Sequence, residues 1–361
     1  MADPTLGIMT LYQKDGTLDE EERTYFRSLV LQGEELGLHV FVFTPEDVDP
    51  SGTSVRAHVY DREKGGWSRA PKPLPDAVYD RCRSQQSPKF RLMRSFRTQY
   101  PKLLYLNHPL SSKWGNHVIL NKDSRIRPHL PLTRRFHTLG DLKEFTALHR
   151  IVYIKPVDGS GGRGIARVTR NGDGQLALSG RDASRAIIQP LTGSPEAVMR
   201  RLSGWITDRR YLIQQGIPLT LKDGRVHDIR LLIQKNASGH WQVTGAAGRI
   251  GAKGSATSNL HGGGEAVSFH RLMAARGFSE AKTAAIRNDM EALGRAIALR
   301  LEGHFGRLCE LALDLAVDPA GHVWLIEVNP KPSREVFKRI GDQAAYTTAL
   351  RRPLEYALFL I

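Results

Sequence analysis

The chain has 361 residues, of which 40% are hydrophobic and 25% charged, and this composition is typical of a soluble globular protein with two or three packed domains. Lysine and arginine number 52 against 37 acidic residues, which gives a formal net charge of +15. Such a charge favours acidic partners, namely polyphosphate, an acidic peptide, nucleic acid or an anionic surface. Because the basic residues are spread along the chain, the charge alone identifies none of these partners.

The residue pattern argues against several other classes of protein. The two cysteines, Cys82 and Cys309, have neither CxxC nor Cys/His spacing, which argues against disulfides and zinc. The N-terminus carries early acids and no long apolar segment, so we expect no signal peptide. No stretch approaches the roughly 18 apolar residues of a membrane span. We therefore expect a cytoplasmic protein.

The N-terminal region predicts an α/β unit. Residues 6–12 and 38–43 are apolar and strand-like, and the residues between them fit an amphipathic helix. Thr17 and Glu20 fit a capping box at the start of that helix. Strand, helix and strand in this order are typical of the opening of a doubly wound sheet. The turn at 13–16 is a poor phosphate cradle, so we interpret this region as a substrate-side domain.

A glycine-rich segment at 151–168 combines two strand patterns with a loop between them. Its glycines match GxGxxG, but a strand pattern follows the loop where a dinucleotide-binding turn needs a helix, and the absence of Gly-Lys-Ser/Thr excludes a P-loop. We expect a hairpin whose glycine flap closes on phosphates through backbone amides, with Lys155 on the entering strand reaching a phosphate. A plain glycine-rich surface turn is the alternative. The flap residues with this candidate role are Gly159, Ser160, Gly161, Gly162 and Gly164.

The apolar run at 211–219 is interrupted by Gln214, Gln215 and Gly216. A strand that continues into a linker between two lobes is a suitable binding site for adenine, because its backbone groups are available to contact the base. A buried connector is an equally good interpretation of the same pattern.

The segment 226–236 predicts a strand, with Asp228 and Arg230 on one face and Ile229 and Leu231 on the other. In one interpretation Asp228 and Arg230 form an internal salt bridge with each other. In the other, Arg230 braces a transferring phosphoryl group or a carboxylate. The sequence leaves both interpretations open.

Two further glycine-rich segments, 248–251 and 258–264, predict loops that carry Arg249 and Asn259. Ordinary surface loops are the alternative. Ser279 then fits the N-cap of a long amphipathic helix, which we assign to the core.

The stretch 309–330 predicts a β-hairpin, because Asp318, Pro319 and Gly321 suit the first, second and fourth positions of a type I turn. The two strands on either side of this turn carry acidic residues among apolar ones. Whether these acids can act together depends on which side chains share a face of the hairpin.

Side-chain alternation predicts how these acids are arranged. On the second strand, Val323, Leu325, Glu327 and Asn329 share one face. Pairing the strands about the turn sets Asp314 opposite Leu325 and diagonal to Glu327, roughly 7–8 Å away. Two carboxylates and an amide carbonyl on one face are the hard oxygen ligands that suit Mg²⁺ or Mn²⁺ beside a phosphate. A half-exposed sheet face with its acids in water is the alternative.

In chain order, the sequence has a Lys-Pro pair before a glycine flap, a linker strand, Asp-x-Arg, arginine and asparagine loops, and an Asp followed by Glu-x-Asn-Pro. This order of motifs resembles that of the ATP-grasp superfamily, and within it the sequence is most similar to the endospore coat-associated YheC/YheD group. The segment 113–133 resembles the entry segment of that group. The resemblance extends from Lys113 to about Phe337 and includes the N-terminal region more loosely.

The resemblance implies an α/β fold of the ATP-grasp type. An N-terminal Rossmann-like domain (residues 1–110) would precede two α+β lobes, the first (111–213) with the glycine flap and the second (214–361) with the metal site. The nucleotide would lie between the lobes, and the implied cofactors are ATP and Mg²⁺ or Mn²⁺.

The resemblance also implies roles for individual residues. The two ATP-phosphate lysines would be Lys113 and Lys155. The residues that hold adenine, largely through their backbone, would be Gln214, Gln215 and Ile217. The residues that face the phosphoryl group or acceptor would be Arg230, Arg249 and Asn259. The metal ligands would be Asp314, Glu327 and Asn329.

Enzymes of this superfamily form an acylphosphate from a carboxylate and ATP, which an amine or another nucleophile then captures, so the protein mainly positions groups and neutralises charge. The resemblance therefore implies an ATP- and Mg²⁺-dependent carboxylate–amine or carboxylate–thiol ligase, with an acidic peptide or amino acid as candidate acceptor and a homodimer as candidate assembly. The alternative is a nucleotide-binding spore-coat or scaffold protein without turnover, which adds the spore as a location. We rank nucleic acid low as a partner, because no basic motif is interleaved with aromatic residues.

Overall fold

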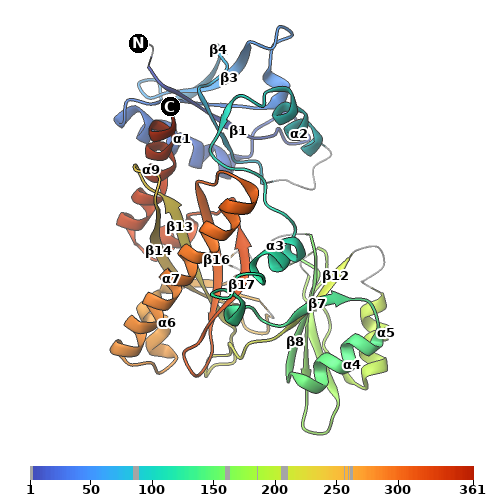
Figure 1. The fold of residues 1–361 in the computed structure, drawn as a ribbon. Coiled ribbons are helices and arrows are strands. Elements are labelled where there is room, and N and C mark those ends of the chain that lie inside the picture. Colours follow the sequence, from blue (N-terminus) through green and yellow to red (C-terminus); the bar gives the residue numbers. More distant parts are fainter. Residues whose placement is uncertain are drawn as a thin grey trace.

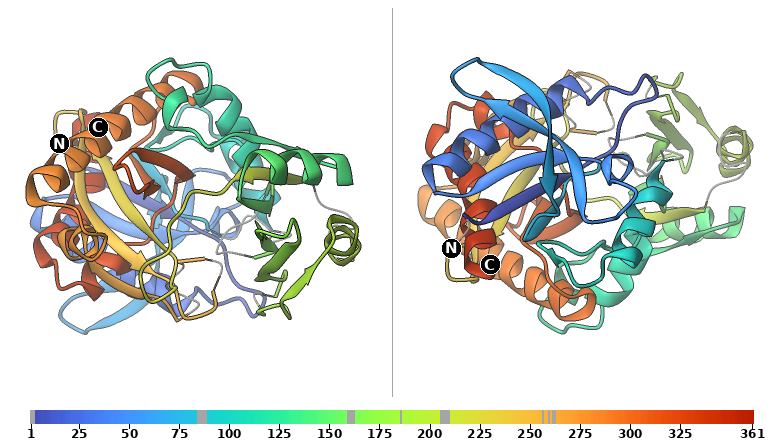
Figure 2. Two further views of the ribbon diagram at one scale, coloured as in Figure 1. Left: turned by 90° about the horizontal axis from the view of Figure 1, so that it is seen from below. Right: turned by 90° about the horizontal axis from the view of Figure 1, so that it is seen from above.

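The computed structural model describes residues 3–83, 89–158, 163–184, 186–204, 210–255, 257–258, 260 and 263–361. The described chain forms three β-sheets that follow one another along the sequence (Figure 1). In both views of Figure 2 the green strands of the second sheet lie to one side of the other two sheets. No helix within these ranges is long and apolar enough to cross a membrane.

The first sheet has the strand order β4-β3-β2-β1-β5-β6, in which β2, β1, β5 and β6 are parallel and β3 and β4 form an antiparallel hairpin. One face packs against α1 (Glu20–Glu35) and the C-terminal α9 (Gln343–Leu360), and the other against α2 (Phe90–Gln99). Because β2 and β5 flank β1 on opposite sides, the sheet has the doubly wound order that the sequence predicts. The strands are β1 (Thr5–Met9), β2 (His39–Phe43), β3 (Ser54–Asp61), β4 (Gly66–Pro73), β5 (Ala77–Asp80) and β6 (Leu104–Tyr105), and a 3₁₀ turn, η1 (Pro45–Asp47), follows β2.

The first helix begins differently from the prediction. Its N-cap is Asp19, whose carboxylate accepts from the backbone N–H of Glu22 at 3.1 Å. The hydroxyl of Thr17 instead donates to Asp15 at 2.7 Å, so the predicted capping box is wrong. Aspartate caps a helix as well as threonine does, and Asp19 stands directly before the first helical residue.

The second sheet is antiparallel, with the order β11-β10-β9-β8-β12-β7. Its apolar face packs against α4 (Leu139–Leu148) and α5 (Pro195–Ser203). The segment that leads into it contains α3 (Lys113–Leu120) and the 3₁₀ turn η2 (Arg127–His129). The strands are β7 (Thr133–Phe136), β8 (Ile151–Pro156), β9 (Ile165–Arg170), β10 (Leu176–Arg181), β11 (Leu191–Gly193) and β12 (Tyr211–Gln215).

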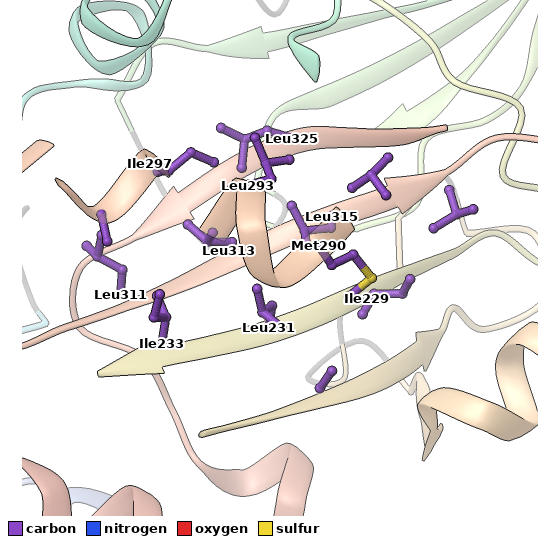
Figure 3. Close-up of a cluster of buried hydrophobic side chains, with 14 of the residues drawn as sticks. Ile229, Leu231, Ile233, Met290, Leu293, Ile297, Leu311, Leu313, Leu315 and Leu325 are labelled. Carbon is purple, nitrogen blue, oxygen red and sulfur yellow. The ribbon is translucent and has the colours of Figure 1, made fainter. Parts of the chain in front are cut away.

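The third sheet is antiparallel as well, with the order β15-β14-β13-β16-β17. The long helix α7 (Glu280–Phe305) covers one face, and the hydroxyl of Ser279 caps it by accepting from the backbone N–H of Lys282 at 3.3 Å. Figure 3 shows Met290, Leu293 and Ile297 of this helix against the leucines and isoleucines of β13 and β16. The remaining elements are β13 (His227–Lys235), β14 (Trp241–Ile250), β15 (Glu265–Ser268), α6 (Phe269–Ala275), β16 (Glu310–Val317), β17 (Val323–Asn329) and α8 (Glu335–Arg339).

A buried ionic cluster around Glu310 joins the first sheet to the third. The Glu310 carboxylate is fully buried and accepts from Tyr79 of β5 at 2.5 Å and from Arg81, which directly follows β5, at 2.8 Å. Arg334, which follows β17, and Gln234 of β13 donate to its other oxygen. Such contacts fix the first sheet against the strand that also carries Asp314.

The expected mixed α/β architecture is confirmed. The expected domain boundaries after residues 110 and 213 remain predictions, and the second of them falls within β12.

Candidate active site

The acids of the late hairpin meet across a β-bulge. Asp314 of β16 lies directly opposite Glu327 of β17, while the next pair is Leu315 with Leu325, so Ile326 is an extra residue on β17. The predicted register, with Asp314 opposite Leu325 and Glu327 on the diagonal, is therefore wrong. The pairs between the turn and the bulge, such as Leu315 with Leu325, already differ by one residue from the predicted register, and the bulge shifts the later pairs by one more.

The bulge also changes which side chains share a face. Val323 and Leu325 point into the core beneath α7. Glu327 and Asn329 pair with Asp314 and Ala312, so they lie on the opposite face from Leu325, and the predicted common face is wrong for Val323 and Leu325. The bulge thus brings the second carboxylate closer to Asp314 than a regular ladder would, because directly opposite residues have Cβ atoms about 4.5–5.5 Å apart.

Asp314 is surrounded by donors. Arg230 donates to it through Nε at 2.6 Å, Arg249 lies 3.0 Å from it through Nη2, and the amide of Asn329 donates to it at 3.2 Å. Burial raises the pKa of this carboxyl, but the two guanidinium groups outweigh burial and the pKa lies below its ordinary value. Asp314 is therefore ionised and already charge-compensated.

The arginines find other partners than the sequence suggests. Asp228 does not pair with Arg230, since Arg249 donates to both of its oxygens, at 2.7 and 2.5 Å. Arg249 belongs to β14 and is 5% exposed, so the predicted loop at this position is wrong. The reason is the strand register: Asp228 lies opposite Arg249, and Arg230 lies opposite Asp314.

Two lysines from outside the third sheet reach the same face. Lys113, the first residue of α3, lies 3.3 Å from Glu327. Lys155 of β8 is buried and donates to the Gln214 side chain at 2.8 Å and to the Ile326 carbonyl at 3.4 Å. Burial lowers the pKa of Lys155 to about 8; the carboxylate of Glu327 opposes this effect and the charge of Lys113 adds to it. The structure therefore brings together the four charged groups that the sequence assigns to phosphate and metal.

The hinge residues lie at the end of β12. Gln214 is buried, and Gln215 exchanges backbone and side-chain hydrogen bonds with Leu132: its N–H donates to the Leu132 carbonyl at 2.8 Å, and its side chain accepts from the Leu132 N–H at 3.1 Å. Ile217 is 4% exposed. The side chain of Gln214 points to Lys155, which is a contact that the sequence did not indicate.

The described part of the flap is Gly164. Its φ angle is +65°, which favours glycine, and its N–H donates to the Asp182 carbonyl at 2.9 Å. The other predicted flap residues and the predicted acceptor-side asparagine lie outside the described residues; they are Gly159, Ser160, Gly161, Gly162 and Asn259.

The donor set at the hairpin fits a magnesium ion. Within the described residues no cluster of three or more histidines, cysteines and acids could hold a metal by itself. Asp314, Glu327 and the Asn329 amide offer two carboxylates and one neutral oxygen donor, which suits a hard cation that takes its remaining ligands from phosphate and water.

One residue of this site received no role in the sequence analysis, although it ends the segment 113–133 that resembles the entry segment of the YheC/YheD group. Thr133, at the start of β7, is 7% exposed and lies opposite Gln214. The sequence motif did not indicate its contact with Gln214, because only strand pairing places Thr133 beside that buried glutamine.

Comparisons with known proteins identify the family and the fold. The family described as YheC/D like ATP-grasp matches residues 102–360. Endospore coat-associated protein YheC of Bacillus subtilis (strain 168) is 27% identical over 357 residues, which cover 96% of this chain and 94% of that protein.

Solved structures with the same fold include two kinds of ligase. VanG D-Ala:D-Ser ligase from Enterococcus faecalis superposes with a TM-score of 0.57 and 12% identity, over 99% of this chain and 100% of that one. ATP-grasp ligase PsnB complexed with minimal precursor, Mg and ADP superposes with a TM-score of 0.51 and 13% identity, over 97% and 98% of the two chains. The fold is therefore that of ATP-grasp ligases, and the chain belongs to the YheC/D-like ATP-grasp family.

Proposed function

We propose that this protein is an ATP- and Mg²⁺-dependent ligase that activates a carboxylate as an acylphosphate and transfers the acyl group to an amine or thiol. The observation that carries the proposal is the meeting of Lys113 and Lys155 with Asp314 and Glu327 on one face of the third sheet. Two cations beside two acids and an amide are the components that a metal-bound triphosphate requires.

Lys155 is suited to a phosphate because the groups that accept its hydrogen bonds within the described residues are neutral. The two acceptors found in the described part of the chain, the Gln214 amide and the Ile326 carbonyl, lack a full charge. A buried ammonium without a carboxylate in direct contact attracts an anion strongly, since water screens it little. Lys113 would add a second positive charge once its contact to Glu327 is released.

The arginines divide into two roles. Arg249 is buried and bonded to both Asp228 and Asp314, so we assign it to holding Asp314 in place. The side chain of Arg230 is 14% exposed against 6% for Arg249, and we assign it to the transferring phosphoryl group or the acceptor. Asn259 stays a proposed acceptor-side residue. A bound Mg²⁺ would neutralise charge on the phosphates, with Asp314, Glu327 and Asn329 as its protein ligands.

The acceptor is proposed to be an amino acid or an acidic peptide. The net charge of +15 favours an anionic substrate. The names of two ligases with the same fold, one acting on D-Ala and D-Ser and one complexed with a precursor, support a small amino acid or peptide substrate.

The test is ATP turnover in the presence of candidate acceptors. ADP release should depend on one class of carboxylate within a set of amino acids, acidic peptides and polyanions. Glu327→Gln should slow this turnover by roughly 10²–10³-fold, as deletion of a comparable electrostatic group does in other enzymes. Glu144→Gln is the matched control, because Glu144 of α4 also pairs with a cation, Arg134 of β7, but at the exposed surface. Unchanged turnover in Glu327→Gln would remove the assignment of the metal site.

A second candidate is a nucleotide-binding coat protein without turnover. The name of the YheC relative, which describes association with the endospore coat, favours it and supports a spore location. Nucleotide binding without ADP release for any acceptor would support this candidate over the ligase.

A further inference from the structure

Three buried hydrogen bonds connect Lys155 to the backbone of Pro131. The Lys155 ammonium donates to Oε1 of Gln214 at 2.8 Å, and Nε2 of Gln214 donates to Oγ1 of Thr133 at 2.9 Å. The Thr133 hydroxyl donates in turn to the carbonyl of Pro131 at 2.8 Å. We call this series the Lys155 hydrogen-bond chain, and its three side chains are each 7% exposed.

The donors and acceptors of the Lys155 hydrogen-bond chain can be arranged in only one way. The Pro131 carbonyl can only accept, so the single hydroxyl hydrogen of Thr133 is used there. Oγ1 of Thr133 must then accept from Gln214, which requires the NH₂ group of the amide on that side. The amide oxygen consequently faces Lys155, and the reversed amide would place two N–H donors against an ammonium.

Strand pairing holds the members of the chain in place. Thr133 of β7 and Gln214 of β12 are directly opposite each other, and Lys155 of β8 is diagonal to Gln214 on the other side of β12. Their side chains lie on the sheet face opposite the apolar core, since Ile154 and Ile213 point into that core. The pairing of β7, β12 and β8 therefore holds the three side chains of the Lys155 hydrogen-bond chain in position.

The Lys155 hydrogen-bond chain orients the Lys155 ammonium without using all of its N–H donors within the described residues. Lys155 has three N–H donors, and within the described ranges two atoms accept from it, Oε1 of Gln214 and the carbonyl of Ile326. A glutamate at position 214 would neutralise the ammonium, whereas the amide oxygen orients it and leaves its charge in place.

We propose that Thr133 is a positioning residue for nucleotide phosphate: by fixing the orientation of the Gln214 amide, its hydroxyl directs the ammonium of Lys155 at the bound anion. The proposal rests on the proposed function, because it takes the anion to be the phosphate of a nucleotide. Thr133 itself touches no substrate in this account.

The experiment measures the dissociation constant of Mg·ADP by calorimetry for the full chain and its variants. Thr133→Val keeps the shape but removes the hydroxyl, and we expect it to weaken binding about tenfold, as for the loss of one buried hydrogen bond. Thr133→Ser keeps the hydroxyl and should bind within about twofold of the wild-type protein. Where activity is measurable, the KM for ATP should rise with little change in kcat.

Thr146→Val is the matched control. Thr146 is a buried threonine of α4 in the same part of the chain, and its hydroxyl donates to the Leu142 carbonyl at 2.7 Å, away from Lys155. It should lose comparable thermal stability and no nucleotide affinity. Thr133→Ala serves as the second hydroxyl-free variant if Thr133→Val does not fold.

The outcomes separate the two proposals. Absence of Mg·ADP binding to the wild-type protein would overturn the proposed function and this inference together. Binding by the wild-type protein with equal affinity in the hydroxyl-free variant would overturn the role of Thr133 alone. Equal loss in Thr133→Ser, which keeps the hydroxyl, and in Thr133→Val, which lacks it, would show that the effect does not depend on the hydroxyl and would also overturn the role of Thr133.

Discussion

Nζ of Lys113 lies 3.3 Å from Oε1 of Glu327, one at the start of α3 and the other near the end of β17. Together with the two arginines on Asp314, this contact means that protein cations compensate both carboxylates of the proposed metal site. A divalent cation must therefore compete with them, unless a phosphate attracts the lysine and arginine away.

This competition predicts coupled binding of metal and nucleotide. Mn²⁺, followed by electron paramagnetic resonance, should bind at least about fivefold more tightly when ADP is present, and ADP should gain by the same factor from Mn²⁺. Lys113→Met should strengthen the binding of Mn²⁺ alone and weaken that of ADP. Lys143→Met, which removes a lysine paired with Glu196 at the surface, is the control and should change neither. Equal Mn²⁺ affinity with and without ADP would contradict the competition.

The lowered pKa of Lys155 predicts how nucleotide binding depends on pH. With a pKa of about 8 the ammonium is charged below this pH and neutral above it. The dissociation constant of ADP should therefore be flat below about pH 8 and rise about tenfold per unit above it. Lys155→Met should bind weakly and without this inflection. A wild-type affinity that stays constant from pH 7 to pH 9.5 would rule out this role of the ammonium.

The lowered pKa of Lys155 also predicts that the charged, buried lysine reduces the free energy of unfolding. The folded protein releases the proton of Lys155 at a lower pH than the unfolded chain, so stability rises with pH between about 8 and 10.5, and the full cost is present below pH 8. Lys155→Met should therefore raise the free energy of unfolding at pH 7 by about 1–2 kcal/mol, after allowance for the unpaired Gln214 oxygen. Urea unfolding at pH 7 and pH 9.5 measures this, and the gain should shrink at the higher pH. A destabilised variant at pH 7 would contradict the account.

The cluster around Glu310 predicts a much larger loss of folding stability when Glu310 is substituted. Glu310→Gln leaves Arg81 and Arg334 buried without their shared anion, and loss of one partner of a buried pair costs about 3–5 kcal/mol. Glu302→Gln is the control, because Glu302 pairs with Lys235 but its side chain is 21% exposed. Chemical denaturation should separate the two variants clearly. If both lost the same small amount, the cluster would not be what holds the first sheet to the third.

Much of the fold follows from local patterns in the sequence. The strand and helix at the N-terminus, the flanking strands of the flap and the helix capped by Ser279 each have a period and boundaries of their own. The face of β13 with Asp228 and Arg230 also follows from alternation alone, since Ile229 and Leu231 must point to the core.

The details of the site depend on pairing between distant strands. Asp228 meets Arg249, and Arg230 meets Asp314, because these residues are opposite each other in the sheet. Nothing in the sequence of either strand specifies that register. The bulge at Ile326 leaves only a faint sign, four successive apolar residues (323–326) where strict alternation would place polar ones. Thr133 becomes meaningful for the same reason, through its position opposite Gln214.

The most direct test of the account is a crystal structure of the protein with Mg²⁺ and ADP. We predict that the β-phosphate contacts Lys113 and Lys155, and that Asp314 and Glu327 hold the metal beside it once the Arg230 contact to Asp314 has loosened, while Arg249 stays bonded to Asp314. Nucleotide bound elsewhere, or at this place with both lysines turned away from it, would contradict the claim that these four residues form one site.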